Sequence, residues 1–238
     1  MKVAIHQPNY FPWIGFFNKV SMADTLVILD SVQFERDGYT NRNKIKLPDS
    51  QKGWAWLTVP VGKGSSQKSI LDVEIDNSQR WNDASLSAIS RNYKSSPHLK
   101  EYSQLIDGIY EQDWDNLCDM NIFIMRELFD VLGLKPRIIR SSELDIKSKK
   151  GDLILDICKE VGGTEYISGI SGKKYMDMAR AEEYGIKVTY QDFKHPVYDQ
   201  VRNPHISNPA FVPNLSILDL LLSCGPVTGH VVRNAALS

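Results

Sequence analysis

Two histidines of this chain are placed where an imidazole could carry out proton transfer. His6 begins residues 6–13, HQPNYFPW, directly after the first apolar run of the chain. His195 begins residues 195–200, HPVYDQ, and follows a predicted strand at residues 186–193. An imidazole titrates near neutral pH, so it can act as a general base or a general acid. Both histidines are therefore candidate catalytic residues, and they would share one cleft if their strands are neighbours.

Asp30 is the third candidate catalytic residue, because it directly follows the apolar residues 26–29. In a parallel sheet it would lie at the same edge as His6, where a carboxylate could orient the imidazole or raise its pKa. Asp30 could equally cap the next turn as an ordinary Asx residue. The sequence leaves both interpretations open.

Polar, basic and aromatic side chains near these segments are candidate substrate-binding residues. Amides and hydroxyls can hydrogen-bond a ligand, while an Arg fork or a Lys charge suits a carboxylate or phosphate. Each type also has a structural interpretation, since aromatic residues pack turns and most basic loop residues are simply solvated. The candidates are Gln7, Asn9, Tyr10, Trp13, Asn41, Arg42, Lys44, Ser168, Lys173, Tyr198 and Gln200.

Residues 168–174, SGISGKK, lie between a predicted strand and a predicted helix. Glycine permits close approach of a ligand to the backbone, and a helix start favours negative charge. A phosphate or carboxylate contact is therefore as well supported as a plain capped turn. The segment is not a Walker A sequence, because the G-x-x-x-x-G-K-[ST] spacing is absent.

No H-x-x-x-H or H-E-x-x-H spacing occurs in the sequence, so no metal site is expected.

The elements that must position these residues alternate between strands and helices. Apolar strands without polar alternation are typical of a parallel sheet covered on both faces. The pattern predicts one α/β domain over residues 1–238, with a mainly parallel, Rossmann-like sheet flanked by helices and a helical insertion in the middle of the chain. Strands are expected at 2–5, 26–29, 54–61, 71–75, 137–140, 165–168 and 186–193, with 31–48 irregular. Helices are expected at 14–23, 81–93, 99–110, 114–132, 152–161, 174–184 and 215–223.

Composition narrows the class of protein. The chain has 238 residues and a formal net charge of -1, so a broad basic surface for duplex nucleic acid is not expected. Three dispersed cysteines argue against a disulfide framework and a Cys-rich zinc site. The N-terminus lacks a signal-peptide pattern, and no apolar run is long enough for a transmembrane segment. We therefore expect a cytoplasmic location.

Seven segments carry motifs of one known family, and they lie at residues 6–15, 29–34, 41–43, 56–61, 166–169, 195–200 and 214–221. In these segments, which run in family order along the chain, the sequence resembles the WbqC-like family of bacterial proteins. One departure is visible: an acidic residue commonly precedes the Val-Gln-Phe run, and this chain has Ser31 there. The resemblance implies an association with O-antigen and other surface-polysaccharide gene clusters, and a glycine-transferase role that attaches an amino acid to a sugar amine.

A second similarity is architectural. A strand ending in His, a loop, a helix and an apolar strand ending near Asp is similar to the opening of nucleotidylyltransferase-type Rossmann-like folds. The His-x-Gly-His element of those folds is absent here. The similarity is therefore an analogy at the level of the fold.

The resemblance to the WbqC-like family implies a transferase that moves glycine or another small aminoacyl group to the amine of a nucleotide-linked amino sugar. His6, oriented by Asp30, would be the base, although the sequence does not decide between the two histidines. No cofactor is specified, and ATP would be needed only if the acyl group is activated in the same site. The alternatives are a nucleotidyl- or glycosyl-transferring enzyme of the same pathway, or a non-catalytic scaffold of a polysaccharide assembly complex.

Overall fold

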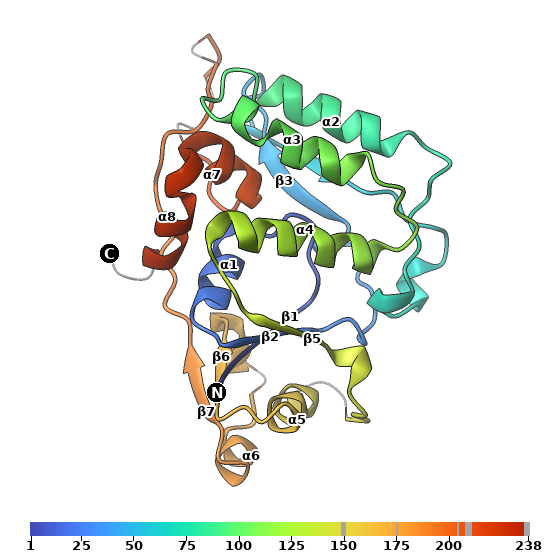
Figure 1. Cartoon of the computed structure of the whole chain (residues 1–238), viewed down its shortest axis with the longest axis vertical. Helices are drawn as coiled ribbons and strands as arrows, with labels where there is room; N and C mark the ends of the chain where they lie inside the picture. Colours follow the sequence, from blue (N-terminus) through green and yellow to red (C-terminus); the bar gives the residue numbers. More distant parts are fainter. Residues whose placement is uncertain (149–150, 175, 204, 208–210, 236–238) are drawn as a thin grey trace.

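A five-stranded parallel sheet forms the centre of the molecule (Figure 1). The structure is a computed structural model and describes residues 1–148, 151–174, 176–203, 205–207 and 211–235. The parallel α/β fold predicted from the sequence is confirmed. The strands lie in the order β5-β2-β1-β6-β7, with bounds β1 Lys2–His6, β2 Thr25–Ile28, β5 Arg137–Arg140, β6 Glu165–Ser168 and β7 Lys187–Tyr190.

The strand order places a topological switch point between β1 and β6. The chain builds β2 and β5 on one side of β1, and then returns to build β6 and β7 on the other side. β1 pairs with β2 as far as His6, opposite Ile28, but pairs with β6 only as far as Ala4, opposite Ile167. The carboxyl ends of β1 and β6 therefore separate, and open α/β sheets bind ligands in the crevice at such a point.

Helices cover both faces of the sheet (Figure 1). α1 (Ile14–Ser21) and α4 (Leu117–Leu132) lie over one face, and α5 (Gly151–Glu160) and α6 (Met178–Glu183) lie over the other. Successive strand side chains point to opposite faces, so each strand contributes to two cores. The core under α1 and α4 includes Ala4, Leu26, Ile28, Phe16, Phe17 and Phe129, and the core under α5 includes Val3, Ile5, Val27, Leu155 and Ile157.

The ends of α4 follow local capping rules. The side chain of Asn116 accepts a hydrogen bond from the backbone N–H of Asp119 at 3.0 Å, which caps the helix N-terminus. The helix ends at Gly133, whose φ of 64° lies in the left-handed region that favours glycine. The predicted stop at Gly133 is confirmed, whereas the helix begins at Leu117 and not at residue 114.

The predicted helical insertion lies between β2 and β5, and it also contains a two-stranded antiparallel ribbon. Residues 42–46, expected to be irregular, form β3 (Arg42–Lys46), which pairs with β4 (Trp54–Thr58). The strand expected at 71–75 is wrong, because Ile70–Asp72 is a 3-10 helix. The α-helices of the insertion are α2 (Trp81–Asn92), α3 (Leu99–Tyr110) and α4.

The C-terminal part departs from the sequence expectation mainly in the lengths of its elements. The helix expected at 174–184 is shorter in the structure. Lys174 ends a 3-10 helix that begins at Ile170, residue 175 lies outside the described part of the chain, and α6 covers only Met178–Glu183. The strand expected at 186–193 is likewise shortened to β7. α7 (Ile217–Cys224) was expected, but α8 (Thr228–Asn234), which packs against α1, was not. The 3-10 helices are Ser65–Gln67, Ile70–Asp72, Ser141–Glu143, Ile170–Lys174 and Gly225–Val227.

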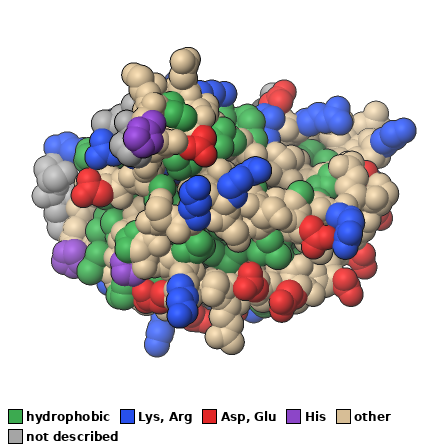
Figure 2. All heavy atoms as spheres, turned by 90° about the horizontal axis from the view of Figure 1, so that it is seen from above, with side chains coloured by type: hydrophobic (Ala, Val, Ile, Leu, Met, Phe, Trp, Pro, Cys, Tyr) green, Lys and Arg blue, Asp and Glu red, His purple; other side chains and the backbone are tan. Residues whose placement is uncertain are grey.

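Charged side chains of both signs lie on the surface of the molecule (Figure 2). Basic and acidic side chains are interspersed on the face drawn in Figure 2, with several acidic ones along its lower edge. Cys118, Cys158 and Cys224 are free thiols. Within the described residues, no helix combines the length and apolar character that crossing a membrane requires.

Candidate functional site

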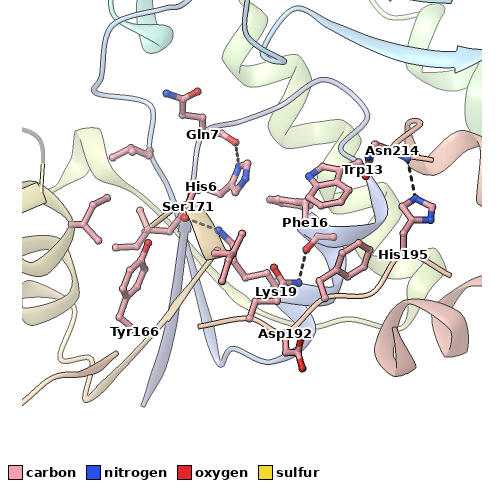
Figure 3. Close-up of a pocket in the computed structure, with 18 residues that line it drawn as sticks. His6, Gln7, Trp13, Phe16, Lys19, Tyr166, Ser171, Asp192, His195 and Asn214 are labelled. Carbon is pink, nitrogen blue, oxygen red and sulfur yellow. Dashed lines mark hydrogen bonds between the residues drawn. The ribbon is translucent and has the colours of Figure 1, made fainter. Parts of the chain in front are cut away.

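A cleft of about 680 Å³ opens beyond the ends of β1 and β6, at the switch point of the sheet (Figure 3). Its volume lies within the range of roughly 300–1,000 Å³ that is typical of small-molecule sites. The end of β1, the start of α1, the turn after β6 and the segment after β7 line it, with Asn214 at one side. His6, Gln7, Trp13 and His195 all line this cleft, although β6 lies between the strands that precede the two histidines.

His6 presents a neutral imidazole, and only one of its ring nitrogens has a hydrogen-bond partner among the described residues. Its Nδ1 lies 2.9 Å from the backbone carbonyl oxygen of Gln7. A carbonyl only accepts, so Nδ1 carries the proton and Nε2 carries the lone pair. Burial, and to a lesser extent the nearby charge of Lys19, lower the pKa of His6 to about 3. The ring is held edge-on to Phe16, with ring centroids 5.0 Å apart.

Asp30 does not orient His6, although the sequence allowed that pairing. Its carboxylate is fully buried and accepts hydrogen bonds from Arg140 Nε at 2.7 Å and from Ser141 Oγ at 3.0 Å. The backbone N–H and the hydroxyl of Ser142 donate to it as well, at 2.9 and 2.8 Å. These four donors tie the end of β2 to the end of β5. The imidazole is oriented instead by the carbonyl of Gln7.

His195 uses both of its ring nitrogens within the protein. Nδ1 donates to the carbonyl of Pro196 at 2.8 Å, and Nε2 accepts from the backbone N–H of Asn214 at 3.0 Å. Burial lowers the pKa of His195, which keeps the ring neutral. Both ring nitrogens of His195 are therefore engaged, whereas the hydrogen bond of His6 involves only its Nδ1.

Lys19 is a cleft residue that sequence reasoning missed. Its side chain is buried, with 5% of the residue exposed, and Nζ donates to the backbone carbonyl of Ile5 at 3.0 Å. Burial lowers the pKa of Lys19 to about 7. A lysine on a short helix usually extends into solvent. The available signal was its place three residues after Phe16 and next to Val20, on the apolar face of α1.

Trp13 forms an aromatic wall of the cleft beside a glycine that leaves it room. Its indole packs edge-on against Phe193, with ring centroids 5.0 Å apart. A Cβ at Gly15 would lie 2.4 Å from the indole ring, so only glycine leaves the ring in this position. At the back of the cleft, Gln191 donates to the carbonyl of Gly15 at 2.9 Å and to Asn18 Oδ1 at 2.6 Å.

The remaining candidate binding residues lie outside the cleft lining. Tyr10 is fully buried and bonds through its hydroxyl to that of Tyr110, while Asn9 is 8% exposed and Asn41 donates to the carbonyl of Val59. Arg42 lies over the ring of Trp56 on the β3–β4 ribbon, at 4.4 Å from its centroid.

Three further candidates have similar internal contacts. Lys44 lies over the ring of Trp54 at 4.5 Å, and Lys173 lies over that of Tyr190 at 5.1 Å. Ser168 is buried and donates to the carbonyl of Gly169 at 3.1 Å.

Tyr198 and Gln200 belong to a buried polar cluster around Asp219. Tyr198 donates to Asp219 at 2.8 Å, Gln200 donates at 2.7 Å and Tyr93 donates at 3.1 Å. Burial raises the pKa of the Asp219 carboxyl to about 6. The cluster anchors the segment after His195 to α7, and neither candidate lines the cleft.

Two comparisons with known proteins identify relatives of this chain. The profile of the WbqC-like protein family matches residues 7–231. The chain is 33% identical over 234 residues to a protein of Mycobacterium tuberculosis (strain ATCC 25618 / H37Rv) named "Uncharacterized protein Rv1507c", an alignment that covers 98% of this chain and 97% of that protein. No solved structure matches the chain.

Among the described residues, no group of His, Cys, Asp or Glu is arranged to hold a metal ion.

Proposed function

This chain belongs to the WbqC-like protein family, and from that premise we propose that it is a transferase of surface-polysaccharide biosynthesis. The acyl group is glycine or another small amino acid, and the acceptor is the amine of a nucleotide-linked amino sugar. The observation that carries the proposal is the cleft at the switch point, which combines an imidazole with a free Nε2 and a buried amine.

Acyl transfer to an amine requires a group that receives a proton. The amine nitrogen attacks the carbonyl carbon of the activated donor, a C–N bond forms, and the bond to the leaving group breaks. His6 Nε2 accepts the proton of the attacking amine. Because the pKa of His6 is about 3, the imidazolium would pass the proton on to the leaving group and return to its neutral form.

The other cleft residues suit the remaining demands of the reaction. The Gln7 side chain lines the cleft, and its amide could donate to the oxygen on which charge develops. Trp13 offers an aromatic surface to a sugar or base ring. Arg42 and Lys44 lie on the β3–β4 ribbon, outside the cleft lining, so we do not assign them to the diphosphate.

A product assay tests the proposed reaction. Purified protein is incubated with glycine, ATP and a panel of amino-sugar nucleotides, and in parallel with glycyl-tRNA as donor, and products are read by mass spectrometry. We expect a sugar nucleotide heavier by one glycyl group. His6→Gln should lower its rate of formation by about 10²- to 10⁴-fold. His230→Gln, on the exposed side of α8, is the matched control and should leave the rate unchanged. Failure of every donor and acceptor pair would exclude aminoacyl transfer.

Nucleotidyl or glycosyl transfer is the second candidate. It is favoured by the position of the cleft at the switch point, where Rossmann-like sheets hold nucleotides. Release of pyrophosphate or of a free nucleoside diphosphate in the same substrate panel would identify it. A non-catalytic scaffold would instead retain its biological activity in the His6→Ala variant and lose it through surface substitutions.

A further inference from the structure

We infer that Lys19 binds an anionic oxygen group of the substrate, a carboxylate or a phosphate, at the base of the cleft between β1 and β6. The ligand thereby brings a counter-charge that the surrounding side chains do not supply. This inference deepens the proposed function and rests on it for the source of the anion. The carboxylate would come from the amino acid, and the phosphate from the sugar nucleotide.

The separation of β1 from β6 explains why the amine lies at this point. The carbonyls of Lys2 and His6 accept from the β2 side, from Asp24 and Leu29. Carbonyls alternate along a strand, so the carbonyl of Ile5 points toward β6. Pairing with β6 has ended at Ala4, one residue earlier. Lys19 Nζ donates to this carbonyl in place of a backbone N–H of β6, and this bond fixes the amine where the two strands separate.

The side chains around Lys19 do not neutralise it. The titratable groups that line the same cleft are His6, Tyr166, Asp192 and His195. Asp192 is exposed, and no carboxylate of the described residues lies within ion-pair distance of Lys19. His6 adds only a repulsive charge when it is protonated.

Lys19 therefore retains unused donors. An ammonium group has three N–H donors, and among the residues that the structure describes the Ile5 carbonyl is the one acceptor for Lys19. A buried cation with unused donors is costly to the free protein and is stabilised by an anion that fills the cleft.

Binding of an anion should consequently be coupled to proton uptake. Burial lowers the pKa of Lys19 to about 7 in the free protein, so much of the amine is neutral between pH 7 and pH 9. An anion within hydrogen-bond distance favours the charged form and raises this pKa. Ligand and proton then bind together, and affinity should fall as the pH rises above 7.

The test measures binding and does not use the transfer reaction. Isothermal titration calorimetry is performed between pH 7 and pH 9 in two buffers of different protonation enthalpy. UDP-N-acetylglucosamine is the diphosphate probe and N-acetylglycine is the carboxylate probe, because the phosphates of the first and the carboxylate of the second stay fully ionised in this range. Titrations with the uridine probe end at pH 8, since its uracil ring begins to lose a proton near pH 9. We expect uptake of up to one proton per ligand, and a Kd that rises by up to about tenfold per pH unit. The probe that shows this linkage identifies the source of the anion.

Two variants separate charge recognition from other roles of the lysine. Lys19→Met should weaken binding by roughly 10- to 100-fold and abolish proton uptake. Lys19→Arg keeps the charge, so it should retain the binding and lose the pH dependence. Lys100→Met, on the exposed side of α3, is the control, and circular dichroism checks that each variant folds.

The outcomes distinguish the two proposals. Equal affinity and equal pH dependence in wild type and Lys19→Met would overturn the inference, and so would the absence of Lys19-dependent binding for both probes. If binding depends on Lys19 while the product assay yields no acylated sugar, the proposed function fails and the anion site remains.

Discussion

The backbone N–H of Asn214 donates to Nε2 of His195 at 3.0 Å, and this bond links two segments at the mouth of the cleft. Asn214 has a φ of 57° and lies shortly before α7, whereas His195 follows β7. The bond requires a neutral imidazole, and burial lowers the pKa of His195 to keep it so. His195 therefore acts on the shape of the cleft through Asn214.

Removing this imidazole should loosen the wall and leave the proton chemistry intact. In His195→Ala we expect faster hydrogen exchange of the Asn214 amide and a KM raised by about tenfold, with kcat changed less than threefold. His195→Asn, which offers a side-chain acceptor, should restore part of the protection. An unchanged exchange rate together with a 100-fold fall in kcat would instead make His195 a catalytic acid or base.

His6 should make the folded protein sensitive to acid. Its pKa is about 3 when folded and near 6.5 when unfolded, so between these values the unfolded chain binds a proton that the folded chain does not. The contribution of His6 to stability is therefore complete above pH 6.5 and is lost as the pH falls toward 3. At pH 5 the loss should be about 2 kcal/mol.

Urea unfolding at pH 7.5 and pH 5 measures this effect. The difference in unfolding free energy between wild type and His6→Gln should shrink by about 2 kcal/mol between the two pH values. His230→Gln, on the exposed side of α8, should show no such change. A difference that stays constant with pH would mean that the imidazole of His6 is not desolvated.

The cleft could be located from the sequence because its features are local. Polar segments that begin with His6 and His195 follow apolar strands, and parallel strands bring such ends to one edge. The pairing of Asp30 with Arg140 could not be predicted in this way. The two residues are 110 positions apart, and only the order β5-β2-β1 decides which neighbour Asp30 meets. The same limit produced the expectation that Asp30 contacts His6.

Other errors arose where residue types act against their usual tendency. The sequence of β3 looks irregular because its outward positions are Arg42 and Lys44, yet both side chains lie over tryptophan rings of β4. The sequence does not single out Lys19, because lysine side chains usually extend into solvent. In both cases the side chain contacts a partner from another element, and a short-range sequence pattern does not reveal that partner.

Asp30 should prove to be a residue of stability. Asp30→Asn replaces one acceptor oxygen by an NH₂ group that faces the donors of Arg140, Ser141 and Ser142. Breaking a buried charge pair in this way costs about 3–5 kcal/mol of unfolding free energy. Asp119→Asn removes the exposed partner of the same Arg140 and should cost at most about 1 kcal/mol. If Asp30→Asn unfolds at the wild-type urea concentration but lacks activity, Asp30 has a catalytic role.

Gly15→Ala should change the cleft without touching its titratable groups. The new Cβ would lie 2.4–2.7 Å from atoms of the Trp13 indole, so the ring must move. Alanine is favoured over glycine by about 1 kcal/mol inside a helix, so α1 should still form. We expect a folded protein with an altered near-ultraviolet circular dichroism signal and weaker binding of UDP-N-acetylglucosamine. Gly108→Ala in α3, where a Cβ meets open space, is the matched control and should bind normally. Wild-type affinity in Gly15→Ala would show that the position of Trp13 does not matter for the ligand, and the aromatic wall would lose its proposed role in binding the sugar or base ring.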